Sequence, residues 1–414
     1  MRQPMVRPSK AAPGDKVAVL SPSFAAPAVA PQVHEQAMRR LEDLTGLVPV
    51  EYPTTRRLGS PAEERADDLN AAFADPEIRA VLATIGGEDQ ITVVPHLNPE
   101  IVRADPKPFL GYSDNTNVLN WLWTQGVAGY YGGSTQVHLG PGPAVDEVHA
   151  NSLRAALLTG ERLLVTEPGE SEDIGKDWSD PAALSQYGDR ASTEPWAWAG
   201  PAKAVTGATW GGCAEVVQWL LTAGRFPDDP TVLDGGVLLL ETSEELIPAR
   251  ELGWIMRSLG ERGLLSAVGA VAVARPPTSS FDVQPSPPER AARRAEQRDV
   301  AIETVQWYNP DAVIVVGVPF GHTRPQWVLP YGGTVMVDGL AQELWADHSY
   351  GGVEGSAPDR RCGVEGRGAD RGAEEALAPV GQGSTGQSRH ARSASRSRPF
   401  TASRSAAQPG PPGR

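Results

Sequence analysis

The chain contains very little cysteine and no long apolar run. Cys213 and Cys362 are the only cysteines among 414 residues, so we expect no disulfide framework, and a reducing cytoplasm fits this composition. The longest apolar run, residues 268–274 with one glycine, is far shorter than the about 20 residues of a membrane-spanning helix. Prolines and charges interrupt the first sixteen residues, and no apolar stretch of a secretory signal follows. We therefore expect a cytoplasmic protein without a membrane segment.

The sequence also lacks the motifs that bind metals or phosphates. It contains neither H-E-x-x-H nor C-x-x-C, the two common spacings of zinc ligands. The glycine pair Gly86-Gly87 could suggest a phosphate-binding turn. However, it has no G-x-G-x-x-G or G-x-x-x-x-G-K pattern, and the acids at 88 and 89 would repel a phosphate. We expect neither a metal nor another cofactor.

Positive charge is scarce over most of the chain. The formal net charge is −14, and segment 352–414, with ten arginines and six acids, contributes +4, which leaves −18 for the rest. Nucleic acids and anionic membranes are polyanions, so both are disfavoured as partners. The segment consists mainly of Gly, Ser, Arg, Ala and Pro and cannot bury a core. We predict a disordered low-complexity tail over 351–414. Its Arg/Ser repeats could contact RNA, but we favour an extension without function.

What the chain does contain is an alternation of strand and helix patterns from residue 16 to about 165. Residues 17–20 form a short apolar strand, and a helix pattern follows from Gln32 with Gly46 as its stop. Residues 60–63, Ser-Pro-Ala-Glu, have the pattern of a capping box at the start of another helix. An alternation of this kind favours an α/β fold with a parallel sheet covered by helices on both faces.

The alternation stops at residue 166 and resumes near Gly207. The segment between is polar but carries Trp178, Trp196 and Trp198. We call residues 166–205 the inter-domain loop, because connections of this length are usually functional or disordered. The second unit has strand patterns at 236–240, 268–274 and 312–316, with a capping box at 286–289. We thus predict an N-terminal domain over 1–165 and a smaller C-terminal α/β domain over 206–350.

Ser113 stands at an abrupt change of pattern. Residues 109–112 predict a strand, and the spacing of Leu119 and Leu122 predicts a helix from Thr116 onward. A serine at such a corner has an exposed hydroxyl and lies near the positive end of the helix dipole, where a developing oxyanion is stabilised. This is the logic of a nucleophile elbow, although the second glycine of G-x-S-x-G is absent. The alternative is an ordinary helix N-cap.

A serine nucleophile needs a base, and seven histidines are available. His322 follows the apolar strand 313–316, at the edge where open α/β sheets place their sites. The alternative for His322 is a loop histidine that binds a carbonyl group. His96 and His138 follow strands or loops and are weaker candidates, and His348 is expected at the edge of the fold.

Carboxylates follow the apolar strand 236–240. Glu241 comes directly after this strand, so its side chain must face either solvent or a partner, and a plain cap is the alternative to an orienting role. Glu244 and Glu245 are expected in the first turn of the next helix, where the helix dipole stabilises acids.

Two backbone amides are candidates for an oxyanion hole. Gly86 and Gly87 end a predicted strand, and glycines there let a ligand approach the backbone closely. We interpret the N–H groups of Gly87 and Asp114 as the pair that would hold an oxyanion beside Ser113.

Several ordered motifs make the sequence similar to the LD-carboxypeptidase family of serine peptidases. This family includes muramoyl-tetrapeptide carboxypeptidases and microcin C7 self-immunity proteins, and the resemblance covers about residues 13–345. The motifs are Arg65-Ala-Asp-Asp-Leu69, Phe73-Ala-Asp-Pro76, Ile85-Gly-Gly87, Lys107-Pro-Phe-Leu-Gly-Tyr-Ser-Asp114, Thr209-Trp-Gly-Gly212, Leu240-Glu241 and Phe320-Gly-His322.

The resemblance implies a catalytic triad of Ser113, Glu241 and His322. It also implies a Rossmann-like or flavodoxin-like N-terminal domain, a smaller C-terminal domain and an active site between them. Members of the family are commonly dimers, so we expect a homodimer that acts on a small-molecule substrate. Cys213 departs from the family pattern, which often has asparagine there.

The inter-domain loop makes the chain resemble the microcin-immunity branch more than the cell-wall branch. Trp178 and Trp196 are the reason, because an indole can stack on a nucleobase with about 1–3 kcal/mol per base. The alternative is that these tryptophans cover the domain junction. We therefore expect a serine carboxypeptidase or amidase that cleaves an aminoacyl- or peptidyl-nucleotide. Cleavage of the L,D-amide in a muropeptide is the second hypothesis, and an inactive protein that sequesters such a ligand is the third.

Overall fold

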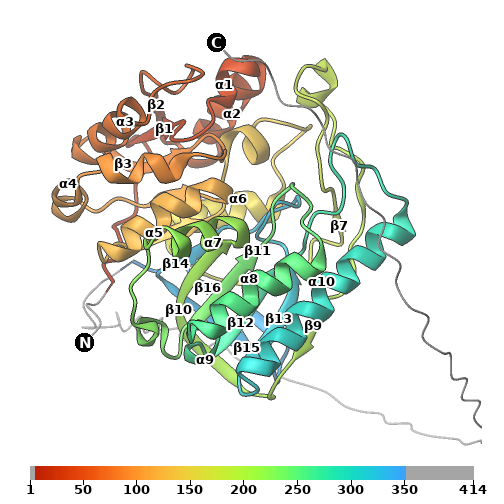
Figure 1. Ribbon diagram of the computed structural model, residues 1–414. Coiled ribbons are helices and arrows are strands. Elements are labelled where there is room, and N and C mark those ends of the chain that lie inside the picture. The colour runs from red at the N-terminus through yellow and green to blue at the C-terminus, as the bar shows by residue number, and fades with distance from the viewer. Residues whose placement is uncertain (1–4, 351–414) are drawn as a thin grey trace, which may run out of the picture. The chain divides into compact units, whose positions relative to one another are not determined.

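Two main β-sheets organise residues 5–350, the part of the chain that the computed structural model describes. Figure 1 shows the N-terminal elements, coloured red to yellow, around one sheet and the green and blue elements around the other. The predicted tail and Cys362 lie outside the described residues.

The first sheet has the strand order β14-β5-β4-β3-β1-β2. All neighbours pair in parallel except β14, which is antiparallel to β5. Without β14 the order is 2-1-3-4-5, that of flavodoxin-like folds, so the predicted parallel α/β architecture is confirmed. The strands are β1 (Lys16–Leu20), β2 (Val48–Glu51), β3 (Ile78–Ala83), β4 (Phe109–Gly111), β5 (Gly129–Tyr131) and β14 (Leu329–Tyr331).

Alternation within the strands explains why helices cover both faces of this sheet. In β1, Val17 and Val19 pack into one core cluster and Ala18 and Leu20 into another, because successive side chains point to opposite faces. Helix α2 covers the first face with Leu41, and α3 covers the second. The N-terminal helices are α1 (Ala26–Val29), α2 (Pro31–Thr45), α3 (Ala62–Ala74), α4 (Pro99–Ala104), α5 (Thr116–Thr124) and α6 (Glu147–Arg154).

Two of the three predicted helix ends are confirmed, and one helix start differs from its expected form. Helix α2 ends at Gly46, whose φ of 69° is the left-handed stop that the sequence predicts. The capping box expected at 60–63 is wrong. Helix α3 begins after Pro61 without a side-chain cap, because the Ser60 hydroxyl donates to the carbonyl of Arg57 instead. The capping box at 286–289 is confirmed, with Glu289 accepting the Ser286 N–H at 2.8 Å.

The second sheet is mixed, with the order β6-β16-β15-β10-β11-β12-β13-β9. Its centre, β10 to β13, is parallel, and the outer strands are antiparallel. The strands are β6 (Arg162–Val165), β9 (Ala197–Ala199), β10 (Ala204–Cys213), β11 (Val237–Glu241), β12 (Ala270–Ala274), β13 (Val313–Val318), β15 (Thr334–Asp338) and β16 (Glu343–Asp347). The helices are α7 (Ala214–Thr222), α8 (Ala249–Glu261), α9 (Leu264–Ala267) and α10 (Pro287–Tyr308).

Strands β14, β15 and β16 have no counterpart in the sequence-based expectation. Strand β14 has three residues and pairs with the distant β5. Strands β15 and β16 pair with each other as a hairpin, but their other partners, β10 and β6, are far away in the chain and are not revealed by local patterns. Strand β14 returns to the N-terminal sheet, and β6 joins the C-terminal sheet, so each sheet includes a strand from the other part of the chain. The domain limits 1–165, 166–205 and 206–350 stay a prediction.

The remaining elements are short. The inter-domain loop contains β7 (Glu170–Ser171) and β8 (Ala191–Ser192), which pair antiparallel with each other. The single turns of 3-10 or π helix are η1 (Gln90–Thr92), η2 (Val94–His96), η3 (Ser113–Asn115), η4 (Thr135–Leu139), η5 (Ala155–Thr159), η6 (Pro181–Leu184) and η7 (Pro230–Leu233).

Candidate active site

Ser113 occupies a strained corner between β4 and α5. Strand β4 ends at Gly111, and the short turn η3 begins at Ser113 and leads directly into the helix. Ser113 has φ 62°, a left-handed conformation that is uncommon for residues other than glycine and that clusters at functional sites. Its carbonyl accepts the Thr116 hydroxyl at 2.7 Å, and its N–H donates to the Tyr131 hydroxyl at 3.2 Å. The expected strand-to-helix corner is therefore present, in the form of a nucleophile elbow.

The glycine pair Gly86-Gly87 lies against this corner. A Cβ on Gly86 would stand 2.9 Å from Ser113 Oγ and 2.8 Å from its Cβ, so only glycine fits there. A Cβ on Gly87 would stand 2.1 Å from the hydroxyl of Ser23, and Gly87 has φ 156°. Among residues 5–350, no acceptor binds the N–H of Gly87 or of Asp114. Two free amides thus lie at the ends of β3 and β4, as an oxyanion hole requires.

The Asp114 side chain holds this edge of the sheet together. It is fully buried and accepts hydrogen bonds from the Ser23 hydroxyl (2.6 Å), the Gln90 N–H (2.9 Å) and the Asn117 amide (2.8 Å). Burial raises the pKa of Asp114, although these three hydrogen bonds oppose the shift. The segments that follow β1, β3 and β4 are therefore fixed to one another beside Ser113.

His322 and Glu241 form a buried acid–base pair. Glu241 is the last residue of β11, and His322 lies in the loop after β13. Glu241 Oε2 is 2.5 Å from His322 Nδ1, and the two side chains are 0% and 8% exposed. Burial lowers the pKa of His322, but the carboxylates of Glu241 and Glu244 outweigh it and hold this pKa well above its usual value. Glu241 thus holds the ring in place and favours its charged form.

Tyr131 connects the serine corner to this pair, and the sequence analysis did not single it out. It ends β5, is fully buried, and donates its hydroxyl hydrogen to Glu241 Oε1 at 2.5 Å. The Tyr131 hydroxyl oxygen also accepts a hydrogen bond from the N–H of Ser113. Burial and the charge of Glu241 raise the pKa of Tyr131, so the hydroxyl stays a donor. A tyrosine at the carboxyl end of the strand next to β4 is the signal that could have pointed to it.

Glu244 departs from its expected position. The sequence predicted Glu244 and Glu245 in the first turn of a helix, but helix α8 begins only at Ala249, after Pro248. The chain between β11 and α8 is a turn, in which Leu246 has φ 55°. Glu244 Oε2 lies 3.0 Å from His322 Nε2 as an ion pair whose geometry does not make a hydrogen bond. Within the described residues, His322 makes no hydrogen bond to Ser113.

The other histidines are placed away from this pair. His138 and His149 are buried and stacked on each other with ring centroids 4.8 Å apart. Tyr112 packs its ring on His138 and on His322, at 5.4 and 5.0 Å, which places His322 beside the serine corner. His348 was expected at the edge of the fold, but it is fully buried and its Nε2 lies 2.9 Å from the Val328 carbonyl.

Motif residues outside the site act as scaffold. Arg65 is buried and pairs with Asp89 through two hydrogen bonds of 2.8 Å. Lys107 is fully buried and donates to the carbonyls of Ala72, Phe73 and Asp75. These two motif cations therefore hold loops and helix ends, and need no ligand.

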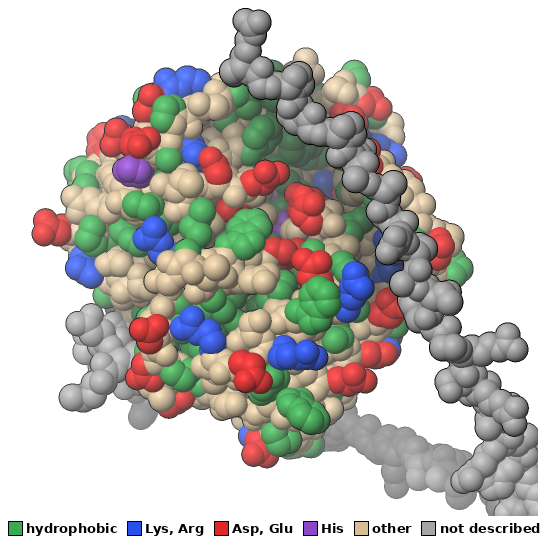
Figure 2. Space-filling view, viewed as in Figure 1, with side chains coloured by type: hydrophobic (Ala, Val, Ile, Leu, Met, Phe, Trp, Pro, Cys, Tyr) green, Lys and Arg blue, Asp and Glu red, His purple; other side chains and the backbone are tan. Residues whose placement is uncertain are grey.

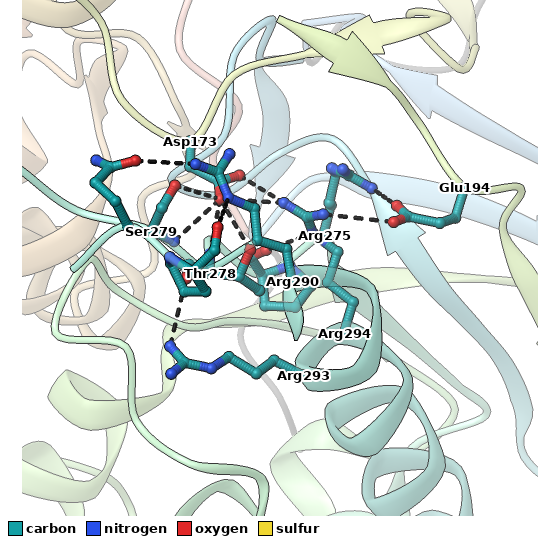
Figure 3. Close-up of polar contacts among 11 residues, drawn as sticks. Asp173, Glu194, Arg275, Thr278, Ser279, Arg290, Arg293 and Arg294 are labelled. Atoms are coloured by element: carbon teal, nitrogen blue, oxygen red, sulfur yellow. Dashed lines mark hydrogen bonds and ion pairs between the residues drawn. The ribbon is translucent and has the colours of Figure 1, made fainter. Parts of the chain in front are cut away.

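Asp173 anchors the inter-domain loop to the C-terminal part. Figure 3 shows it surrounded by donors from Thr278, Ser279 and Arg294. Thr278 and Ser279 each donate a backbone N–H and a hydroxyl to Asp173 Oδ2, at 2.9 to 3.1 Å. Arg294 pairs with Asp173 Oδ1 at 2.9 Å and with Glu194, of the same loop, at 3.4 Å. The sequence did not single out Asp173, because its partners lie about a hundred residues away.

A second anchor joins the inter-domain loop to the loop that carries His322. Glu172 is buried, and its carboxylate lies 3.2 Å from Arg324 Nη1. Arg190 pairs with Asp146 at 2.8 Å and lies 3.6 Å from Glu172. Because Arg324 is only two residues from His322, this buried ion-pair network supports the position of the histidine.

Both tryptophans proposed for ligand binding are half-buried. Trp196 packs against the hydrophobic core, with its ring centroid 6.4 Å from that of Trp198 on β9. Trp178 lies next to Asp177, whose carboxylate accepts the Ser179 N–H and hydroxyl at 2.8 Å. The packing of Trp196 agrees with a covering role.

Neither a metal centre nor a membrane helix stands out. Within residues 5–350, no three His, Cys, Asp or Glu side chains are grouped so that they could hold a metal ion. In the same part of the chain, no helix has the length and apolar character needed to cross a membrane.

The fold is an α/β fold with a serine at a strained corner after β4 and an acid–histidine pair on the C-terminal sheet, an arrangement that a serine hydrolase can use. The chain belongs to the LD-carboxypeptidase family: it matches the LD-carboxypeptidase N-terminal domain over residues 17–132 and the LD-carboxypeptidase C-terminal domain over residues 206–337. The predicted family is thereby confirmed, as is the assignment as a serine-type carboxypeptidase.

Individual relatives agree with this assignment. A protein of Vibrio cholerae named "Putative carboxypeptidase" is 29% identical over 78% of this chain and 93% of its own length. The microcin C7 self-immunity protein MccF of Escherichia coli is 23% identical over 67% of this chain and 76% of its own. A structure of MccF in complex with glutamyl sulfamoyl guanosine superposes with a TM-score of 0.71 at 20% identity and covers 84% of this chain and 99% of that one.

Proposed function

We propose that this protein hydrolyses the amide bond of an aminoacyl- or peptidyl-nucleotide with Ser113, His322 and Glu241 as its triad. The observation that carries the proposal is the continuous connection from the strained Ser113 through the Tyr131 hydroxyl to Glu241 and His322. It supports the proposal because a serine at a helix start, a carboxylate and a histidine lie along one series of contacts between the two sheets.

The chemistry follows from these positions. Ser113 Oγ forms a bond to the scissile carbonyl carbon, and its proton moves to His322 Nε2. The N–H groups of Gly87 and Asp114 hold the oxyanion. The carbon–nitrogen bond then breaks, and His322 returns the proton to the leaving nitrogen. Water attacks the acyl-enzyme by the same route and restores Ser113. For the first step, Nε2 must exchange its contact with Glu244 for one with the serine.

The nucleotide part of the proposal rests on similarity and on the inter-domain loop. MccF has been solved with glutamyl sulfamoyl guanosine, an aminoacyl-nucleotide analogue. In this chain the loop carries two half-buried indoles, Trp178 and Trp196, which leave ring surface for a base to stack on. Gly86 keeps the approach to Ser113 open.

Two other functions remain in competition. Removal of a terminal D-amino acid from a muropeptide needs the same triad and is the activity after which the family is named. A protein that sequesters its ligand without turnover is favoured by one contact, because His322 Nε2 faces Glu244 and not Ser113. We further propose a homodimer in the cytoplasm, and size-exclusion chromatography with light scattering tests the dimer.

One side-by-side assay tests the proposal. Purified protein is given norleucyl-sulfamoyl adenosine, whose side chain is uncharged, and an L,D-tetrapeptide, and release of each product is followed. We expect turnover of the nucleoside compound and much slower turnover of the peptide. The reverse order moves the muropeptide function ahead, and tight binding without turnover of either supports sequestration.

The tryptophans give the assay a second arm. Replacement of the stacking residue, Trp178→Ala or Trp196→Ala, should raise KM for the nucleoside compound about ten- to a hundredfold. The tetrapeptide has no base and should be affected much less. Trp307→Ala is a matched control, since this indole is 84% exposed on α10. If both loop variants behave like the control, the stacking role is wrong.

A further inference from the structure

Glu244 occupies the nitrogen of His322 that the serine needs. Its carboxylate lies 3.0 Å from Nε2, and its side chain is 61% exposed, whereas the Glu241 side chain on the other nitrogen is fully buried. Figure 2 shows acidic side chains grouped near the centre of the face turned to the viewer. An exposed carboxylate at the reacting nitrogen can be reached by substrate, which the buried one cannot.

The turn that carries Glu244 is held in place by hydrogen bonds to helix α7. Buried Glu215, on α7, accepts the Ser243 N–H at 3.1 Å and the Ser243 hydroxyl at 2.8 Å. Two residues after Glu244, Leu246 adopts a positive φ of 55°. Hydrogen bonds and a strained residue thus fix the turn that presents the Glu244 carboxylate. An ordinary surface glutamate does not need such a fixed backbone.

The negative charge of Glu244 determines which substrate group can replace His322 as its partner. Partial desolvation beside the His322 ring raises the pKa of Glu244, but the contact with His322 outweighs it and lowers this pKa to about 2, so the group is an anion. In the described part of the chain, His322 is its ion-pair partner and no lysine or arginine pairs with it. Productive reacting atoms lie about 3–3.5 Å apart, so this carboxylate stands close to the scissile bond. A cation is attracted there and a second carboxylate is repelled.

We propose that Glu244 is a specificity residue that binds a positively charged group of the substrate next to the scissile amide, and that this exchange frees His322 Nε2 for Ser113. The group is either an α-ammonium or a basic side chain of the acyl residue. The inference rests on the proposed serine hydrolysis and adds a substrate class to it: cationic acyl residues are preferred and acidic ones are rejected.

Matched acyl residues test the preference. We compare kcat/KM for lysyl-, norleucyl- and glutamyl-sulfamoyl adenosine, which differ in side-chain charge, and for N-acetyl-norleucyl-sulfamoyl adenosine, which lacks the α-ammonium. Wild type should prefer the lysyl over the glutamyl compound by about ten- to a hundredfold if the side chain binds. If the α-ammonium binds, acetylation should cause a loss of the same size. In Glu244→Gln either difference should shrink at least fivefold.

Glu245→Gln is the matched control, because Glu245 is the exposed neighbour in the same turn. It should keep both wild-type ratios. A ratio that survives in Glu244→Gln, or a wild-type preference for the glutamyl compound, overturns the proposal.

A second measurement separates this proposal from the nucleotide substrate. The ring signals of His322 are followed by NMR while lysinamide or norleucinamide is added. Lysinamide should shift them more than norleucinamide in wild type and Glu245→Gln, and both amides should act alike in Glu244→Gln if the side chain binds. N-acetyl-norleucinamide should shift them less than norleucinamide if the α-ammonium binds. If wild type hydrolyses none of the sulfamoyl compounds, the nucleotide substrate is wrong, and this titration alone decides on Glu244: equal shifts by all three amides overturn it.

Discussion

The two sheets contribute to the site in different ways. The N-terminal sheet supplies backbone geometry: a strained serine, two free amides and a glycine pair at the ends of β3 and β4. The C-terminal sheet supplies ionisable side chains, with Glu241 at the end of β11 and His322 after β13. A nucleophile needs a fixed direction of attack, whereas a base needs a tuned pKa. In the proposed mechanism, each requirement is met by a separate part of the fold.

Tyr131 is the direct link between the two parts. Its hydroxyl accepts from Ser113 on one side and donates to Glu241 on the other. A second link nearby is the Thr116 hydroxyl, which accepts the Cys213 N–H at 3.2 Å. Cys213, which stands where the family often has asparagine, also contacts Glu215 at 3.2 Å and so remains part of the support for the site.

Removal of the nucleophile should have the largest effect. Ser113→Ala should lower kcat about 10³- to 10⁶-fold, because members of a triad act as a unit. Circular dichroism should show an intact fold, and steady-state kinetics with the best substrate gives the measurement. Ser192→Ala, at an exposed serine of the inter-domain loop, is the control. Retained turnover in Ser113→Ala would show that Ser113, and with it the N-terminal sheet, does not supply the nucleophile.

Loss of the link should have a smaller effect. Tyr131→Phe removes a hydrogen bond to a buried carboxylate, which is worth about 1.5–3 kcal/mol, so kcat should fall roughly ten- to a hundredfold. Tyr130→Phe is the matched control in the same strand, since its hydroxyl faces Lys10 and the His348 carbonyl. Equal rates for the two variants would mean that the two parts of the site act without this link.

The C-terminal part should set the pH dependence. Glu241 and Glu244 raise the pKa of His322, and the base must be neutral, so kcat/KM should rise with pH through this pKa. Glu244→Gln removes one of the two carboxylates that raise the pKa of His322 and should therefore move the acid limb to lower pH. Glu245→Gln should leave the limb in place. A limb that moves to higher pH would contradict the assignment.

The same shift affects stability with a definite sign. A folded-state pKa above the unfolded value stabilises the protein below about pH 6.5, and this contribution is lost as pH rises through the folded pKa. Glu244→Gln should therefore lower the free energy of unfolding near pH 6, and the difference from wild type should shrink at high pH.

Sequence patterns found what depends on local order and missed what depends on distant pairing. The β4–α5 corner, the strand before Glu241 and the glycine pair could be predicted, because each depends on a pattern of a few consecutive residues. Tyr131, Asp173 and the pairing of β14 with β5 could not, because their partners are far away in the chain. Glu244 was misplaced for a related reason: its turn is fixed by Glu215, which lies on another helix.

The anchor of the inter-domain loop should affect stability more than chemistry. Asp173→Asn keeps an acceptor but removes the charge that pairs with Arg294, and the side chain is only 2% exposed. The free energy of unfolding, measured with urea at pH 7, should fall by about 1–3 kcal/mol. Asp177→Asn, at an exposed carboxylate of the same loop that accepts hydrogen bonds from Ser179, should leave it nearly unchanged.

The pH dependence of this loss separates the anchor from a general packing defect. Burial raises the pKa of Asp173, but Arg294 and the donors from Thr278 and Ser279 outweigh burial and lower it. A lowered folded pKa stabilises the protein above the unfolded value of about 3.9 and is lost as pH falls through the folded pKa. The Asp173→Asn difference should therefore be full at pH 7 and diminish below about pH 4. Because no contact joins Asp173 to the triad, kcat for a small acyl substrate should stay within about twofold of wild type. A tenfold loss of kcat would show that the loop is coupled to the chemistry, and the contrast between the two sheets would then have to include it.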